Sequence, residues 1–141
     1  MKAIYKSLIV SIFTIACVSV VSCKKSDPAP PDLADKLVGS YKVTAIGNLP
    51  NNLPAAPTAA SVNVVRAGSA LDQVQITAAY SITSTAGGQA ISDSKTITLQ
   101  QAGDNIDLYD GTAKVGNWNN NTIFASDYPF LTAKISFVAT K

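Results

Sequence analysis

The chain contains no histidine and no glutamate among its 141 residues, and it has only two cysteines. Histidine is the commonest general base near neutral pH and the commonest ligand of transition metals. Without imidazoles or a supply of thiolates, a zinc site lacks its usual ligands. Aspartate, lysine and tyrosine are the only candidates left for acid–base chemistry. The composition therefore predicts a protein that is not an enzyme and that holds no metal and no cofactor.

Charged residues are also scarce, at 14% of the chain. The sequence has 11 basic and nine acidic residues. Lys2 and Lys6 belong to an N-terminal segment, and without them nine basic residues remain. The remaining basic residues are scattered along the sequence. A domain without net charge or a basic patch has no field to attract nucleic acid, so no nucleic-acid partner is expected.

The N-terminal segment has the pattern of an export signal. Lys2 and Lys6 give it a basic start, and residues 8–21 form an apolar run interrupted only by serine and threonine. This run of about 14 residues is shorter than the roughly 20 needed to span a bilayer core, and it has the length of a signal-peptide core. A retained membrane anchor is the alternative. Residues 1–22 are predicted to be a cleaved signal peptide.

The end of this run, Val20-Val21-Ser22-Cys23, resembles the lipobox of bacterial lipoproteins. The resemblance implies cleavage between Ser22 and Cys23 and attachment of lipid to the Cys23 thiol. Cys17 would leave with the signal peptide, so the mature chain would have no disulfide. The alternative is an ordinary cleaved secretory signal followed by a spare thiol.

Residues 23–36 are predicted to tether the folded domain to the membrane. Three prolines between residues 28 and 31 favour an extended polyproline conformation, which spaces the domain from the bilayer. Lys24 follows the lipidated cysteine directly, in place of the aspartate that retains lipoproteins in the inner membrane. We therefore expect a lipid anchor in the cell outer membrane, facing either the periplasm or the cell surface.

From residue 39 onward the chain is rich in β-branched residues and regularly interrupted by turn residues, after one helical turn at residues 32–38. The clearest alternation lies between residues 72 and 83, where apolar residues fall at every second position. The pattern predicts eight strands, at residues 39–46, 61–66, 72–83, 93–101, 104–109, 112–118, 122–126 and 131–140.

Short connections between successive strands predict an all-β antiparallel meander over residues 37–141, closed or partly closed into an eight-stranded barrel. An open β-sandwich has nearly the same pattern and is the alternative. One connection, residues 47–60, is unusually long, and Leu49 and Leu53 within it are candidates for a lid over the barrel mouth.

Residues 37–43, Leu-Val-Gly-Ser-Tyr-Lys-Val, resemble the opening of lipocalin-like domains, in which Leu-x-Gly-x-Trp begins the first strand. Tyr41 replaces the tryptophan of that pattern. No arginine near the last strand is available to lie across its ring, and Lys134 is the nearest cation that we expect there. The resemblance implies an eight-stranded barrel with a cup for one small ligand, closed by the long loop after the first strand.

Several alanines fall at positions predicted to point inward: Ala45, Ala78, Ala113, Ala133 and Ala139. Small side chains inside an eight-stranded barrel leave room for a small ligand, although tight packing of a narrow barrel explains them equally. The candidate residues for the cavity or its lid are Tyr41, Leu49, Leu53, Tyr80, Trp118 and Phe137. Aromatic residues at strand spacing also serve as ordinary core.

Two functions follow as hypotheses. The first is a membrane-anchored, non-enzymatic lipoprotein of the cell envelope that binds a small apolar ligand in its barrel. The second is a structural or accessory subunit that docks a larger envelope protein complex through an aromatic face. Asp104, Asp107 and Asp110 do not have the spacing of an EF-hand calcium loop, and we interpret them as aspartates that flank turns and keep a strand edge soluble.

Overall fold

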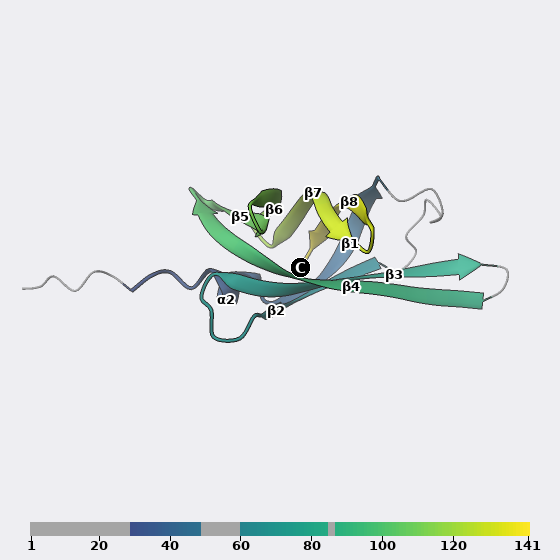
Figure 1. Cartoon of the computed structure of the whole chain (residues 1–141), viewed down its shortest axis with the longest axis horizontal. Coiled ribbons are helices and arrows are strands. Elements are labelled where there is room, and N and C mark those ends of the chain that lie inside the picture. The colour runs from purple at the N-terminus through teal and green to yellow at the C-terminus, as the bar shows by residue number, and fades with distance from the viewer. Residues whose placement is uncertain (1–28, 49–59, 85–86) are drawn as a thin grey trace, which may run out of the picture.

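The computed structural model describes residues 29–48, 60–84 and 87–141, and the side chains of residues 82–89 are left aside. The described chain forms a short helix followed by antiparallel strands (Figure 1). These elements are α2 (Leu33–Leu37), β1 (Gly39–Gly47), β2 (Ala60–Arg66), β3 (Gln73–Ser84), β4 (Gly87–Ala102), β5 (Asn105–Asp110), β6 (Ala113–Asn119), β7 (Thr122–Phe130) and β8 (Ala133–Thr140). The predicted signal peptide, the lipobox and residues 23–28 of the predicted tether lie outside the described residues.

The strands follow one another around a closed barrel in the order β1 to β8, and β1 pairs with β8 to complete it. Every pair is antiparallel, as expected for a meander with short connections. Figure 1 shows β2, β3 and β4 on one side of the core and β5 to β8 on the other. The prediction of a closed eight-stranded barrel is confirmed, and the open sandwich is excluded.

The core follows from the alternation that β3 displays in the sequence. Val74, Ile76, Ala78 and Tyr80 are buried, whereas Gln75 between them is exposed. Because successive strand residues point to opposite sides of the sheet, this one pattern turns a whole face into the barrel. Burial of each aliphatic side chain of this size contributes about 1.5–3 kcal/mol relative to exposure.

One end of the barrel is covered by α2. The Asp32 carboxylate accepts a hydrogen bond from the backbone N–H of Asp35 at 3.0 Å and so caps the helix. Leu33 and Leu37 are buried, and the N–H groups of Leu33 and Ala34 both donate to the Leu71 carbonyl oxygen at 2.9 Å. The predicted helical turn is confirmed, and its role is to close this end of the barrel. In the described part of the chain, no helix combines the length and the hydropathy needed to cross a membrane.

Two strands are longer than the sequence predicts. β4 begins at Gly87 rather than at residue 93, because the chain from Gly87 to Thr98 pairs continuously with β3. Its polar residues Ser92 and Ser94 are exposed, so they interrupt the hydrophobic pattern without interrupting the strand. β7 continues to Phe130 because a register shift between Ala125 and Tyr128 brings Tyr128 back to the core.

The inward direction of three of the five alanines was predicted wrongly. Ala78 and Ala139 are buried, but Ala45 and Ala113 are exposed and Ala133 is only half-buried. A register shift between Val43 and Ala45 explains the first error, because an extra residue in a strand turns the side chains beyond it to the other face. The interior therefore contains fewer small side chains than the sequence suggests.

Candidate functional site

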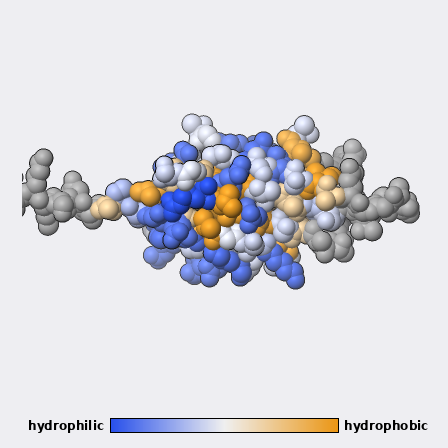
Figure 2. Space-filling model, turned by 90° about the horizontal axis from the view of Figure 1, so that it is seen from below, coloured by the Kyte–Doolittle hydropathy of each residue, from blue (hydrophilic) through white to orange (hydrophobic). Residues whose placement is uncertain are grey.

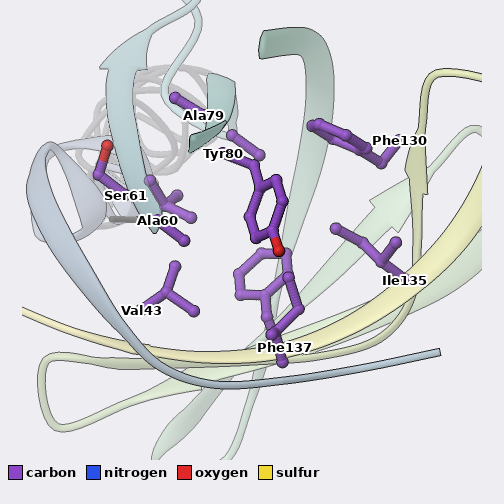
Figure 3. A pocket seen from close by; sticks show the side chains of 11 residues that line it. Val43, Ala60, Ser61, Ala79, Tyr80, Phe130, Ile135 and Phe137 are labelled. Atoms are coloured by element: carbon purple, nitrogen blue, oxygen red, sulfur yellow. The ribbon is translucent and has the colours of Figure 1, made fainter. Parts of the chain in front are cut away.

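An apolar pocket lies at the end of the barrel opposite α2, where β1 ends and β2 begins. Its walls come from β1, β2, β3, β7 and β8 (Figure 3). The lining residues are Val43, Ile46, Ala60, Ser61, Val62, Ala78, Ala79, Tyr80, Phe130, Ile135 and Phe137. None of these side chains is ionisable at neutral pH, so the pocket suits an uncharged, apolar group.

The pocket is small. Its volume is about 20 Å³, which is close to the space that one water molecule occupies. Pockets for drug-sized molecules measure about 300–1,000 Å³. An apolar ligand of several carbon atoms therefore needs the aromatic side chains of the wall to move.

Figure 3 shows where those aromatic side chains lie. The Tyr80 ring crosses the pocket toward Phe137 and carries its hydroxyl oxygen to the centre, while the Ser61 hydroxyl points away from the pocket. Phe130 and Ile135 form the wall opposite Ala60 and Ser61. Tyr80 is the residue that places a polar atom inside this otherwise hydrocarbon space.

The structure separates the residues that the sequence grouped into one site. Tyr80 and Phe137 line the pocket, whereas Tyr41 and Trp118 do not. Leu49 and Leu53, and the predicted lipidation and cleavage residues Cys23 and Ser22, lie outside the described residues. Ile46 of β1 and Ala60 of β2 are both in the pocket wall.

Tyr41 belongs to the opposite, closed end of the barrel. Its hydroxyl donates to the carbonyl oxygen of Leu37, the last residue of α2, at 2.7 Å. Burial raises the pKa of the Tyr41 hydroxyl. The Trp118 indole N–H is buried and has no hydrogen-bond partner among the described residues. Tyr41 thus holds α2 on the barrel, and Trp118 packs against the core.

Sequence reasoning missed most of the pocket wall, including Val43, Ile46, Phe130 and Ile135. The alternation of β8 contains part of the signal, since Ile135, Phe137 and Ala139 are all buried. The contribution of Phe130 had no such signal, because residues 127–130 were not predicted to be strand. β1 to β3 and the β7–β8 pair are far apart in the sequence, and they meet at one end of the barrel because the barrel is closed.

A second hollow region lies on the outer surface of β6, β7, β8 and β1. Two adjoining depressions of about 340 and 260 Å³ share Ala125, Phe137 and Val138 at their floor. Phe124 borders the larger depression and is 45% exposed. By contrast, Figure 2 shows the side of the molecule formed by β2, β3 and β4 as mostly hydrophilic, with small separate hydrophobic patches.

Among residues 29–48, 60–84 and 87–141, no three side chains of the types that bind metals come together at one point. Asp107 instead forms an ion pair with Lys114 at 2.7 Å, and this contact raises the pKa of Lys114. Asp104, Asp107 and Asp110 occupy the β4–β5 connection and β5.

No family model, no curated protein and no solved structure matches the chain. The resemblances to the lipobox and to the lipocalin opening therefore stay predictions from the sequence.

Proposed function

We propose that this chain is a non-enzymatic lipoprotein of the bacterial cell envelope, anchored in the outer membrane through Cys23, whose barrel takes a small apolar ligand. The observation that carries the ligand-binding part is the apolar pocket around Tyr80 and Phe137, at the end of the barrel opposite α2. The lipobox pattern at residues 20–23 supports the anchor.

The arrangement of the barrel supports attachment of the anchor at one end and ligand binding at the other. α2 includes the last residues of the predicted tether, 33–36, and covers one end, so the anchor would attach there. The pocket lies at the other end, away from that attachment. A ligand would therefore enter from the side of the domain that faces away from the anchoring bilayer.

The small volume restricts the kind of ligand. With about 20 Å³ of free space, the pocket accepts only a terminal methyl group or a similar short apolar group unless its side chains move. A larger ligand must displace Phe130 or Phe137, at the cost of their packing. We therefore expect a compact apolar molecule, or the end of a chain, bound with modest affinity.

The anchor is tested by expressing the full chain in its host with Cys23→Ser and fractionating the cells. Lipid attachment needs a thiol, so the variant should leave the membrane fraction or remain uncleaved. Cys17→Ser is the matched control and should sediment with membranes as the unchanged chain does. Membrane sedimentation of the Cys23→Ser product at its mature length would contradict the anchor.

The pocket is tested separately on the full chain extracted from host membranes, by native mass spectrometry for bound molecules. Ala78→Leu should abolish the co-purified ligand because it fills the free space of the pocket. Ala113→Leu makes the same change at an exposed position and should retain the ligand. Absence of any bound molecule from the unchanged chain would refute the pocket function and leave the anchor untouched.

The outer hollow region favours a second function, docking to a protein of the envelope. Phe124 is a large, exposed aromatic side chain beside two depressions, and such anchors dominate the energetics of protein interfaces. A pull-down from host membranes with the tagged full chain distinguishes the two functions. A stoichiometric partner lost in Phe124→Ser but kept in Ala78→Leu would support docking, and equal loss in both would argue against it.

A further inference from the structure

β4 has an open edge along more than half of its length. It pairs with β3 from Gly87 to Thr98, but with β5 only from Thr98 to Ala102. Residues 87–97 therefore have a strand neighbour on one side only among the described strands. A free strand edge presents unpaired N–H and C=O groups and is a template for a further strand.

The contacts of Ser94 show which backbone groups this edge presents. Its N–H donates to the Asp93 carboxylate at 2.9 Å, and this places the N–H on the side of β4 away from β3. Because the direction of backbone groups alternates along a strand, Ser92 and Thr96 offer their N–H and C=O groups on the same edge. The side chains of these three residues are exposed on the outer face of the sheet. They therefore do not stand in the way of a strand that approaches this edge.

Charge makes this edge complementary to itself. Asp93 and Lys95 flank Ser94, and an antiparallel pair of two β4 strands centred on Ser94 puts each Asp93 opposite the partner's Lys95. The same register puts Ile91 opposite the partner's Ile97. Shifting the register by one step of the ladder in either direction would place an isoleucine opposite one of these charges. The pairing centred on Ser94 is therefore the one that the side chains select.

We propose that two copies of this chain associate through residues 91–97 of β4, forming one continuous sheet across a two-fold axis at Ser94. Asp93 protects the edge in the single chain: it accepts hydrogen bonds from the N–H groups of Ser94 and Leu131, the latter at 2.8 Å, and lies 3.6 Å from Lys95. On association, the Ser94 N–H bonds to the partner's Ser94 carbonyl oxygen. The freed carboxylate oxygen then pairs with the partner's Lys95. The proposal depends on neither the lipid anchor nor the pocket.

The two-fold axis at Ser94 gives a sharp test by cysteine crosslinking. Opposed residues of a hydrogen-bonded antiparallel pair have Cα atoms about 5.5 Å apart, within the range that a disulfide spans. Ser94→Cys in the full chain should form a crosslinked dimer in host membranes treated with copper phenanthroline as oxidant. Ser92→Cys is the matched control, because residue 92 faces Thr96 of the partner subunit and not its own copy. The unchanged chain gives the background from Cys17 and Cys23.

Crosslinking of Ser94→Cys at least fivefold above both controls is the expected result. Equal yields for Ser94→Cys and Ser92→Cys, or a yield at the background level, would overturn the proposal.

The charge pairing is tested with two differently tagged copies of the full chain, co-expressed and purified through one tag. Lys95→Asp places like charges opposite each other and should lower the co-purified second copy at least fivefold. Lys95→Arg keeps the charge and should retain it within twofold. Lys95 is partly exposed and contacts Asp93 alone among the ion pairs of the described residues, so neither change should unfold the barrel. Co-purification unaffected by Lys95→Asp would exclude this interface.

Discussion

The ammonium group of Lys141 lies over the ring of Tyr41, 5.8 Å from the ring centroid, and donates a hydrogen bond to the carbonyl oxygen of Val38 at 2.6 Å. The Tyr41 hydroxyl in turn donates to the carbonyl oxygen of Leu37. The last residue of the chain thus joins the end of α2 to the start of β1. The sequence indicated Lys134 as the cation near Tyr41, but β8 pairs Lys134 with Pro129, at the other end of the strand.

Replacing Lys141 should loosen this junction. In Lys141→Gln the charge over the Tyr41 ring is lost, and we expect the free energy of unfolding to fall by about 0.5–1 kcal/mol, as for exposed cation–π contacts. Lys141→Arg should retain most of it. Urea unfolding followed by tryptophan fluorescence measures the effect, and Lys134→Gln is the control with no expected change. A loss equal in both glutamine variants would show that the contact contributes nothing specific.

Tyr41→Phe should cost more than the change at Lys141. The hydroxyl is buried, and its removal leaves the Leu37 carbonyl oxygen without that partner. Such an unsatisfied buried group costs about 1–3 kcal/mol. The same urea experiment measures it, with the half-buried Tyr109→Phe as control. A stability within 0.5 kcal/mol of the unchanged chain, about the spread of neutral surface substitutions, would show that the helix does not depend on this bond.

The fold was predictable because the alternation of residues 72–83 and the turn signals between strands are local properties. β3 and β8 show the alternation most clearly, since their buried residues are those that the two-residue period indicates. Ala45 shows where this reasoning fails. A single bulge reverses the alternation, and no local signal in the sequence marks it.

The candidate site was predictable only in part. Tyr80 and Phe137 were found because each lies on the inward face of a regular strand. Tyr41 was placed in the same site because it shares that inward direction, but the position of a residue along the barrel axis depends on the tilt of the strands. The size of the pocket depends on how Tyr80, Phe130 and Phe137 pack together, which no single strand pattern contains.

Asp32 should matter both as a helix cap and as an ion-pair partner. Its carboxylate accepts from the Asp35 N–H and lies 2.6 Å from the Arg66 guanidinium, and the Arg66 contact holds its pKa below 3.8. Asp32→Asn keeps a capping oxygen and loses the charge, while Asp32→Ala loses both. We therefore expect the melting temperature at pH 7 to fall from the unchanged chain to Asp32→Asn and further to Asp32→Ala.

The pH dependence checks the cause. Since the pKa of Asp32 is lowered by folding, its contribution is present above pH 3.8 and is lost as the pH falls below it. The difference in melting temperature between the unchanged chain and Asp32→Asn should therefore shrink below pH 4. A difference that persists unchanged at pH 2.5 would exclude the ion pair as its source.

Phe137→Ala should open the pocket at a large cost in stability. Phe137 is buried, contacts Tyr128 edge-to-face with ring centroids 5.5 Å apart, and lines the pocket. Loss of a buried phenylalanine costs about 3–5 kcal/mol and leaves a cavity. Benzene should therefore raise the melting temperature of this variant more than that of the unchanged chain. The exposed Phe124→Ala is the control, with little change in stability and no benzene effect.

Tyr128 should make the barrel sensitive to alkali. Its ring is buried and its hydroxyl donates to the Ile76 carbonyl oxygen at 3.0 Å. Burial raises its pKa well above the ordinary value of 10.0, and the nearby carboxylates of Asp93 and Asp110 act in the same direction. Above pH 10 the unfolded chain loses this proton while the folded chain keeps it, so the free energy of unfolding falls with a slope of up to about 1.4 kcal/mol per pH unit.

The slope should be smaller in Tyr128→Phe, which has no proton to lose at this position. Urea unfolding of both proteins between pH 8 and pH 11 separates this effect from the titration of lysines, which the two share. Below pH 9 the variant should be less stable by about 1 kcal/mol, because the bond to Ile76 is missing. The two curves should therefore converge as the pH rises, and parallel curves would mean that the Tyr128 hydroxyl ionises as readily in the barrel as in the unfolded chain.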